Sequence, residues 1–163
     1  MSTVILSEVQ IDQKIKRIAF QILENNIEED HIYIAGISSN GYILAKRLKE
    51  KLIHLSDKNI TLCEVKVDKK DPLDHVETSI GIDKLSGCSV VLVDDVLNSG
   101  KTLIYAVRYF LQVPLKKIKT AVLVDRNHKK YPVKSDFKGI SLSTSLEEHV
   151  EVSFQNEAKA ILF

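Results

Sequence analysis

The chain lacks a long apolar run and lacks any marked excess of charge. Its 163 residues hold 23 Lys and Arg against 22 Asp and Glu, a formal net charge of +1. A membrane-spanning helix needs about eighteen consecutive apolar residues, and a secreted protein carries an amino-terminal signal pattern. Because neither pattern is present, we expect a soluble cytoplasmic protein that has no membrane partner.

Cysteine is also scarce, and this argues against a fold that is stabilised by bound metal or by disulfide bonds. The two cysteines, Cys63 and Cys88, fit no metal-ligand spacing and sit in apolar stretches of sequence. Such residues are more often buried free thiols than disulfide or zinc ligands. We therefore predict two buried free thiols and assign them no function.

Linkers, internal repeats and low-complexity segments are absent as well. The length and the apolar fraction of 44% are ordinary for a globular domain that buries a substantial core. The sequence therefore predicts a single domain over residues 1–163.

Apolar strands alternate with amphipathic helices along the chain. Residues 11–23 have helical spacing of isoleucines, with Ser7 as a candidate N-cap, and residues 42–52 form a second helical pattern. The predicted strands span residues 31–37, 60–67, 90–93 and 118–125. This alternation predicts an α/β fold, in which a parallel β-sheet has helices on both faces and binds ligands beyond the carboxyl ends of its strands.

The stretch VVLVDDVLNSGKT, residues 90–102, is the most informative in the chain. A buried strand is followed by two carboxylates, Asp94 and Asp95, and then by a small-residue turn that opens a helix. Free backbone N–H groups and the positive end of the helix dipole make such a turn an anion site. The carboxylates would repel a phosphate, so we predict that they accept hydrogen bonds from sugar hydroxyls and help to hold a magnesium ion. This order indicates a site for a phosphorylated sugar.

The ending SGKT also invites interpretation as a nucleoside-triphosphate loop of the form GxxxxGK[ST]. The first glycine of that motif would fall at position 95, which is Asp95. A carboxylate there would face the phosphates that the loop must wrap. We therefore reject the triphosphate loop.

Two further segments are predicted to border the same cleft. The turn SSNG, residues 38–41, follows the strand at 31–37 and would emerge at the same edge of the sheet. Residues 68–85 are polar and predict a loop, in which Lys69 and Lys70 could close over a ligand as a lid. A solvated charged loop is the alternative interpretation of these lysines.

The motif at residues 90–102 resembles the phosphoribosyl pyrophosphate (PRPP) motif of type I phosphoribosyltransferases. Together with AGISSNGYILAKRL and AVLVDRNHKKYPVKSDFKGISLSTS, it is similar to the pyrimidine operon regulators that double as uracil phosphoribosyltransferases, and more distantly to 6-oxopurine phosphoribosyltransferases. The resemblance implies the type I phosphoribosyltransferase fold with a small carboxyl-terminal hood, binding of PRPP, Mg and a nucleobase, and assembly into a homodimer or higher homo-oligomer.

The resemblance also implies a role for individual residues. The first turn would bind pyrophosphate, the acidic pair the ribose hydroxyls and Mg, the second turn the 5-phosphate, and the hood the base, with Val150 offering backbone groups. The pyrophosphate residues would be Ser38, Ser39, Asn40 and Gly41, and the ribose and Mg residues would be Asp94 and Asp95. The 5-phosphate residues would be Asn98, Ser99, Gly100, Lys101 and Thr102, and the base residues would be Arg126, His149 and Val150.

The chain departs from the family pattern at three places. Asn40 stands where a basic residue is usual, Asn98 stands where the 6-oxopurine enzymes carry a proton-transferring Asp, and the loop after Val67 is shortened and lacks an arginine-containing segment. A neutral amide neither stabilises a departing anion by charge nor acts as a general base. Two functions therefore remain open: a transferase that joins uracil, another pyrimidine or a 6-oxopurine to ribose 5-phosphate, and a non-catalytic sensor of PRPP or nucleotide that regulates pyrimidine gene expression.

Basic residues late in the chain offer a candidate RNA surface. They are Lys116, Lys117, Lys119, Arg126, Lys129, Lys130 and Lys134. Strong nucleic-acid binders usually show a basic excess, whereas acids and bases are almost matched here. Surface lysines that maintain solubility are the favoured interpretation, and RNA is kept as an alternative partner.

Overall fold

The computed structural model describes residues 1–68, 70, 71, 73 and 75–163. The predicted lid residue Lys69 lies outside the described residues. The elements in chain order are β1 (Thr3–Leu6), α1 (Glu8–Asn25), β2 (His31–Ile37), α2 (Asn40–Leu55), β3 (Asn59–Val67), β4 (Val76–Thr78), the 3-10 helix η1 (Ile82–Leu85), β5 (Ser89–Leu97), α3 (Lys101–Phe110), β6 (Lys117–Asp125), β7 (Phe137–Ser141), β8 (Val150–Ser153) and β9 (Lys159–Leu162).

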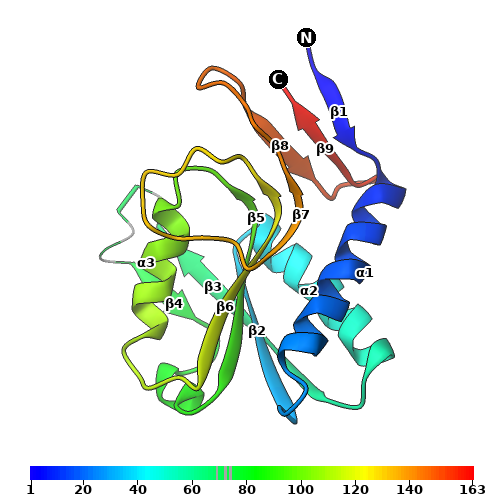
Figure 1. Cartoon of the computed structure of the whole chain (residues 1–163). Coiled ribbons are helices and arrows are strands. Elements are labelled where there is room, and N and C mark those ends of the chain that lie inside the picture. Colours follow the sequence, from blue (N-terminus) through cyan, green and yellow to red (C-terminus); the bar gives the residue numbers. More distant parts are fainter. Residues whose placement is uncertain (69, 72, 74) are drawn as a thin grey trace.

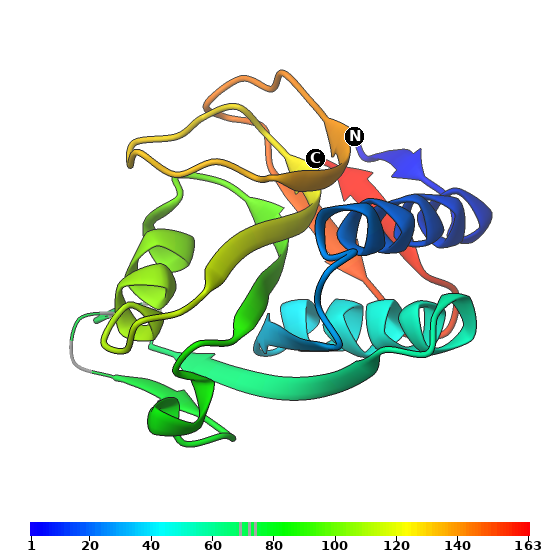
Figure 2. The same ribbon diagram turned by 60° about the horizontal axis from the view of Figure 1, so that its bottom comes forward.

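Six strands form the central sheet, in the order β4-β3-β2-β5-β6-β7. The pairs β2–β3, β2–β5, β5–β6 and β6–β7 are parallel, and only the short edge strand β4 pairs antiparallel, with β3. Helices α1 and α2 cover one face and α3 covers the other (Figures 1 and 2). The predicted α/β class with helices on both faces is confirmed, with a sheet that is mostly rather than wholly parallel.

Helix α1 begins and packs as its sequence predicts. The side chain of Ser7 accepts a hydrogen bond from the Gln10 N–H (3.3 Å), and the Gln10 side chain accepts one from the Ser7 N–H (2.9 Å). This capping box satisfies two backbone donors that the first turn of a helix leaves unpaired. The predicted apolar face is buried; it consists of Ile11, Ile15, Ile18, Ala19 and Ile22.

Strand β5 separates two hydrophobic cores. Val91 and Val93 pack into the core under α1 and α2, while Val90 and Leu92 pack into the core under α3. Alternate side chains of a strand point to opposite faces, so a strand between two helical layers is apolar at every position. Full burial of each such side chain stabilises the fold by roughly 1.5–3 kcal/mol, which explains the unbroken run VVLV.

Two sequence-based boundaries are wrong. The prediction ended this strand before the acidic pair, but β5 continues to Leu97 and its ladder with β6 includes Asp94 paired with Val122. Backbone pairing with β6 outweighs the low strand preference of aspartate. Residues 68–85, predicted as a loop, also contain β4 and η1.

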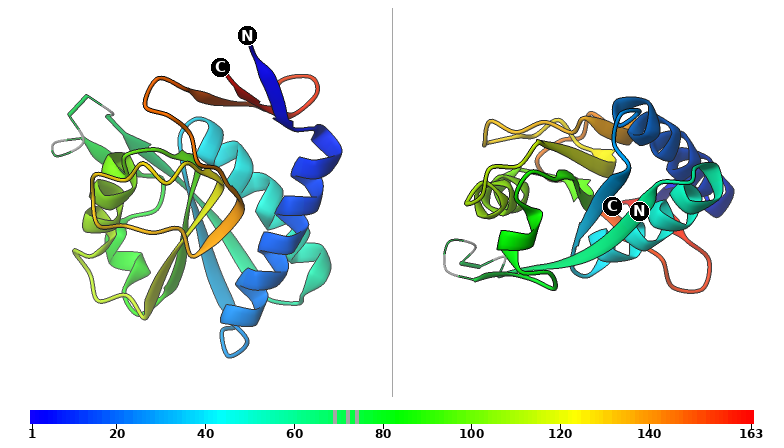
Figure 3. Two further views of the ribbon diagram at one scale, coloured as in Figure 1. Left: turned by 45° about the horizontal axis from the view of Figure 1, so that its top comes forward. Right: turned by 90° about the horizontal axis from the view of Figure 1, so that it is seen from below.

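A second, three-stranded antiparallel sheet joins the two ends of the chain, in the order β1-β9-β8. It lies beyond the carboxyl ends of the central strands, and the two termini emerge side by side (Figures 1 and 3). Val152 and Ala160 of this sheet are buried in the core that α1 also covers. This sheet forms the predicted hood, but its strand β1 comes from the amino terminus and was not predicted.

Both cysteines are free, as predicted, but only one is buried. Cys63 is fully buried in β3, whereas Cys88 is partly exposed. Burial raises the pKa of the Cys63 thiol, so the thiol stays protonated and unreactive. Within the described residues, no helix is long and apolar enough to cross a membrane.

Candidate functional site

A cavity of about 250 Å³ lies at the carboxyl end of β5. The predicted acidic pair and the predicted 5-phosphate residues all line it, together with apolar neighbours from β5, α3 and β6. Its lining consists of Asp94, Asp95, Val96, Leu97, Asn98, Ser99, Gly100, Lys101, Thr102, Leu103 and Val122. A single continuous segment thus brings two carboxylates and a helix start to one concave surface.

The second turn, residues 98–102, ends in the first residues of α3. Gly100 is the N-cap, with a left-handed backbone (φ 87°) that suits glycine. The Lys101 N–H donates to Ser99 Oγ (3.2 Å), and the N-cap residue Gly100 makes no side-chain capping bond. The backbone N–H groups of the first helical turn lie at the cavity end of the helix, where the dipole is positive.

The acidic pair is held in place by short backbone contacts. Asp94 is 7% exposed, and its Oδ1 accepts from the Asp95 N–H (2.9 Å). The half-buried Asp95 accepts from the Val96 N–H at Oδ1 (2.8 Å) and from Asn40 Nδ2 at Oδ2 (3.2 Å). Each carboxylate oxygen accepts up to two hydrogen bonds, so Asp95 keeps acceptor capacity for a ligand hydroxyl or a cation.

The first turn, residues 38–41, is packed directly against the strand that carries the acidic pair. A Cβ added to Gly41 would lie 2.8 Å from the Val93 carbonyl oxygen and 2.9 Å from Asp94 Cα. Only glycine allows so close an approach of the α2 start to β5. Ser38 is also engaged, because its Oγ donates to Glu64 Oε2 (2.8 Å). The first turn adjoins the acidic pair, but none of its residues is among those that line the cavity.

Asn40 bridges the acidic pair and the hood. Its Nδ2 donates to Asp95 Oδ2 (3.2 Å) and to the Val152 carbonyl oxygen in β8 (2.8 Å). An amide nitrogen has two N–H donors, and both have protein partners here. The side chain predicted to face pyrophosphate is thus a junction between α2, β5 and β8.

The backbone N–H and C=O groups of Val150 lie at the outer edge of the hood sheet. His149 and Phe163 exchange two backbone hydrogen bonds (3.1 and 2.8 Å), and the next pair along the ladder is Val150 with Leu162. In an antiparallel ladder such pairs alternate, so the N–H and C=O of Val150 point away from β9, toward the outer edge of β8. The Val152 carbonyl, two residues further on, points to that edge as well and accepts from Asn40.

Arg126 and His149, the other predicted base residues, lie in different settings. Arg126 is 8% exposed, and its guanidinium donates to Asn98 Oδ1 (2.9 Å), to Thr144 Oγ1 (3.1 Å) and to the Ser145 and Glu148 carbonyls. His149 forms backbone hydrogen bonds with Phe163, and the residue is exposed. The structure brings Arg126 to the second turn and joins it to the chain that leads into β8.

Sequence reasoning missed Glu64 and Val152, which contact the first turn from β3 and β8. A carboxylate within the otherwise apolar strand ITLCEVKV is a signal that could have pointed to Glu64. Val152 acts through its backbone oxygen, which leaves no signal in the sequence.

Comparison with known proteins identifies the family of the chain. Residues 3–157 match the model of the phosphoribosyl transferase domain. The chain is 34% identical over 151 residues to the bifunctional protein PyrR of Streptococcus thermophilus, covering 91% of this chain and 87% of that protein. It is 34% identical over 154 residues to the pyrimidine operon regulatory protein of Lactococcus lactis, covering 91% of this chain and 87% of that protein.

Solved structures share the fold. A hypoxanthine-guanine phosphoribosyltransferase from Bacillus anthracis superposes with a TM-score of 0.73 at 22% sequence identity, covering 85% of this chain and 81% of that chain. Because the matched domain spans nearly the whole chain and the curated relatives match over most of their length, this chain belongs to the phosphoribosyltransferase family, where its relatives include the PyrR pyrimidine operon regulators.

Proposed function

We propose that this protein is a magnesium-dependent phosphoribosyltransferase, which joins a nucleobase to ribose 5-phosphate and releases pyrophosphate from PRPP. The observation that carries the proposal is the cavity in which the acidic pair and the start of α3 meet. The helix start supplies N–H donors for a 5-phosphate, and Asp94 and Asp95 supply acceptors for the ribose hydroxyls.

In the proposed reaction, a ring nitrogen of the base attacks the anomeric carbon of PRPP. The bond between that carbon and the pyrophosphate oxygen breaks, its electron pair leaves with pyrophosphate, and the attacking nitrogen loses its proton. The protein contributes mainly by positioning and by electrostatic stabilisation. Because the Asn98 amide cannot act as a base, the proton loss relies on another group or on the acidity of the nucleobase itself.

The acidic pair fits a magnesium ion that is bound together with the ligand. Magnesium in such enzymes is usually held by one or two carboxylates plus substrate oxygens and water. Asp94 and Asp95 provide those carboxylates, and the described residues contain no group of three or more potential metal ligands that would hold a metal alone. The ion would neutralise charge on the leaving pyrophosphate.

The base would lie against the outer edge of β8. The backbone N–H and C=O of Val150 face that edge, and a paired donor and acceptor match the amide-like edge of uracil or of a 6-oxopurine. We favour uracil or another pyrimidine as the base, and the name of the Lactococcus relative, a pyrimidine operon regulatory protein, supports a pyrimidine. We assign Arg126 and His149 to the same base site, with Arg126 reaching it through the segment that leads into β8.

A second candidate is a non-catalytic sensor of PRPP or nucleotide that regulates pyrimidine gene expression. Asn40 offers no positive charge to pyrophosphate and spends both amide donors on protein atoms, which favours binding without turnover. The name of the Lactococcus relative, a pyrimidine operon regulatory protein, supports the same candidate.

RNA is a less favoured partner for this chain. Five of the seven basic residues in the candidate RNA surface make contacts within the protein: Lys116, Lys117, Arg126, Lys129 and Lys134. Lysines paired with carboxylates contribute less positive potential to a nucleic-acid surface. We also propose that the protein is cytoplasmic and assembles into a homo-oligomer.

An assay of pyrophosphate release and nucleotide formation distinguishes the transferase from the sensor. Purified protein is incubated with PRPP and magnesium and with uracil, hypoxanthine, guanine or orotate, one at a time. Nucleotide formation with one base establishes the transferase. PRPP binding by calorimetry without product from any base would instead establish the sensor. A crystal grown in sulfate should show an anion against the backbone of Ser99, Gly100 and Lys101; a turn that stays empty in sulfate would refute the phosphate site.

A further inference from the structure

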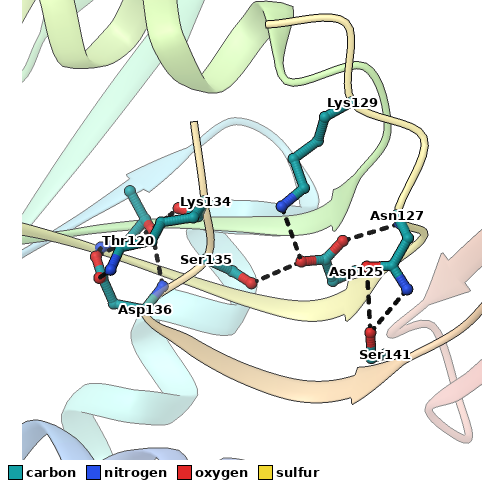
Figure 4. Close-up of polar contacts among 8 residues, drawn as sticks. All are labelled: Thr120, Asp125, Asn127, Lys129, Lys134, Ser135, Asp136 and Ser141. Atoms are coloured by element: carbon teal, nitrogen blue, oxygen red, sulfur yellow. Dashed lines mark hydrogen bonds and ion pairs between the residues drawn. The ribbon is translucent and has the colours of Figure 1, made fainter. Parts of the chain in front are cut away.

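Asp125, the last residue of β6, is a buried carboxylate outside the cavity lining. It is 1% exposed. Its Oδ1 accepts from the Asn127 N–H (3.0 Å), and its Oδ2 accepts from Ser135 Oγ (2.9 Å) and lies 3.8 Å from Lys129 Nζ. Figure 4 shows these three contacts converging on the carboxylate. One buried carboxylate therefore contacts both the first residues and the end of the β6–β7 connection, residues 126–136.

The backbone of the connection depends on these contacts at its start. Asn127 has a left-handed backbone (φ 61°), which few residues other than glycine adopt. The hydrogen bond from its N–H to Asp125, and a second one from its Nδ2 to Ser141 Oγ (3.0 Å), secure this conformation (Figure 4). The chain is thereby turned back across the start of α3.

The connection in turn holds the second turn. The N–H groups of Lys130 and Tyr131 both donate to the Ser99 carbonyl oxygen (2.8 and 3.2 Å). The next residue of the turn, Gly100, packs on the same connection, because an added Cβ would lie 2.6 Å from Val133 Cγ1. The connection passes over the beginning of α3 in Figures 1 and 3.

The Ser99 carbonyl sets the direction of an N–H group in the turn. In a planar trans peptide the C=O and the following N–H point in opposite directions. Since the Ser99 carbonyl points to the connection, the Gly100 N–H points away from it. Gly100 lines the cavity, so the contact to Ser99 fixes the orientation of a donor that the site needs.

We propose that Asp125 is a positioning residue that orients the Gly100 N–H of the second turn through the β6–β7 connection and the Ser99 carbonyl. The proposal rests on the proposed function, because that N–H group is one of those assigned to the 5-phosphate. Asp125 itself does not contact the ligand. Its loss should therefore weaken phosphate binding while leaving the acidic pair unchanged.

The test compares Asp125→Asn with the matched control Asp136→Asn. Asp136 ends the same connection and accepts from the Thr120 N–H (2.9 Å), far along β6 from the second turn. Both variants lose one charge and one anchor of the connection. Thermal unfolding, calorimetric affinity for ribose 5-phosphate, and amide hydrogen exchange of residues 98–103 are measured for each.

We expect Asp125→Asn to speed exchange in residues 98–103 and to weaken ribose 5-phosphate binding by at least about tenfold, since small displacements of a binding group cost that much. Asp136→Asn should lower the melting temperature without either effect. Ser135→Ala, which removes one partner of Asp125, should give a smaller change in the same direction and serves if Asp125→Asn does not fold.

Two outcomes would overturn the proposal: unchanged exchange and affinity in Asp125→Asn, or equal changes in Asp136→Asn. The proposed function fails separately if the wild type does not bind ribose 5-phosphate. In that case, faster exchange confined to Asp125→Asn and Ser135→Ala would still establish the positioning role.

Discussion

The two turns that open α2 and α3 have the same local plan and different surroundings. Each follows a central parallel strand at the same edge of the sheet and leads into a helix whose N-cap residue makes no side-chain capping bond. The first turn is enclosed: Asn40 donates to Asp95 and Val152, and Gly41 touches β5. The second turn is held by the β6–β7 connection, because the Ser99 carbonyl oxygen accepts hydrogen bonds from backbone N–H groups of that connection. The turn itself lines the cavity.

The difference teaches that a helix start at the right edge of a sheet does not by itself make an anion site. What distinguishes the second turn is the direction of its contacts. The Ser99 carbonyl oxygen is bound by the β6–β7 connection, so the Gly100 N–H points away from that connection. In the first turn, side-chain donors are spent on neighbouring elements, so that turn joins the hood to the acidic pair.

The largest expected effect concerns the acidic pair between the two turns. Asp94→Asn combined with Asp95→Asn should weaken ribose 5-phosphate binding more than tenfold, because charge-assisted hydrogen bonds contribute roughly 1.5–3 kcal/mol each. Calorimetry measures the affinity, and circular dichroism checks that the double mutant is folded. The exposed Asp12, replaced by Asn, is the control. Unchanged affinity in a folded double mutant would show that the carboxylates do not hold the sugar.

Glycine substitutions test the packing of the two turns separately. Gly41→Ala and Gly100→Ala should each lower the free energy of unfolding by about 1–3 kcal/mol, the first through overpacking against β5 and the second through its left-handed backbone and Val133. Gly81→Ala is the matched control, because its added Cβ would have no heavy atom of the described residues within 4 Å apart from its two chain neighbours. Urea unfolding measures all three. Wild-type stability in Gly41→Ala would refute the tight junction between α2 and β5.

Local patterns were enough to predict most of the central sheet and the cavity. The strand at residues 31–37 was predicted with its observed bounds, and residues 94–102 were predicted to meet at one site. Both features depend on residues that are close in sequence, where periodicity and turn chemistry act.

Contacts between distant segments were not predictable in this way. Strand β1 is only four residues long and pairs with β9 at the other end of the chain, so its own sequence carries a weak signal. The bridge from Asn40 to the Val152 carbonyl spans 112 residues and uses a backbone atom that every residue type has. The support of Ser99 by the β6–β7 connection is likewise made by backbone groups.

Asn40 provides the sharpest test of whether the first turn is a junction. Asn40→Ala removes two hydrogen bonds and should cost about 1–2 kcal/mol of stability, because a typical buried bond contributes about 1 kcal/mol. It should weaken base binding at β8 more than ribose 5-phosphate binding. Urea unfolding and calorimetry with each ligand measure the two effects.

Asn40→Arg distinguishes the junction from a defective leaving-group site. A guanidinium binds pyrophosphate through charge and paired hydrogen bonds. If the first turn serves catalysis, the arginine should raise turnover, measured by chromatography of the nucleotide formed. If Asn40 is a junction, turnover should stay level or fall as the bond to Val152 is lost. Raised turnover without loss of stability would contradict the junction.

The smallest effect is expected at the opposite edge of the sheet, where charges only stabilise the fold. The Lys116 ammonium bonds Glu29 (2.5 Å) and holds the pKa of that carboxyl below its ordinary value of 4.5. The pair therefore stabilises the folded state above pH 4.5, and this contribution is lost as the pH falls through the lowered pKa.

Glu29→Gln should accordingly unfold at slightly lower urea concentration than the wild type at pH 7, and the gap should close as the pH falls through the lowered pKa of Glu29, below which the wild-type carboxyl is also neutral. Its affinity for ribose 5-phosphate at pH 7 should equal that of the wild type, because Glu29 lies at the end of the sheet away from both turns. A stability gap that persists in acid would mean that Glu29 acts through packing and not through its charge. A loss of ribose 5-phosphate affinity would mean that a change at the amino ends of the central strands affects the ligand site at their carboxyl ends. The difference between the two turns would then depend on more than their local contacts.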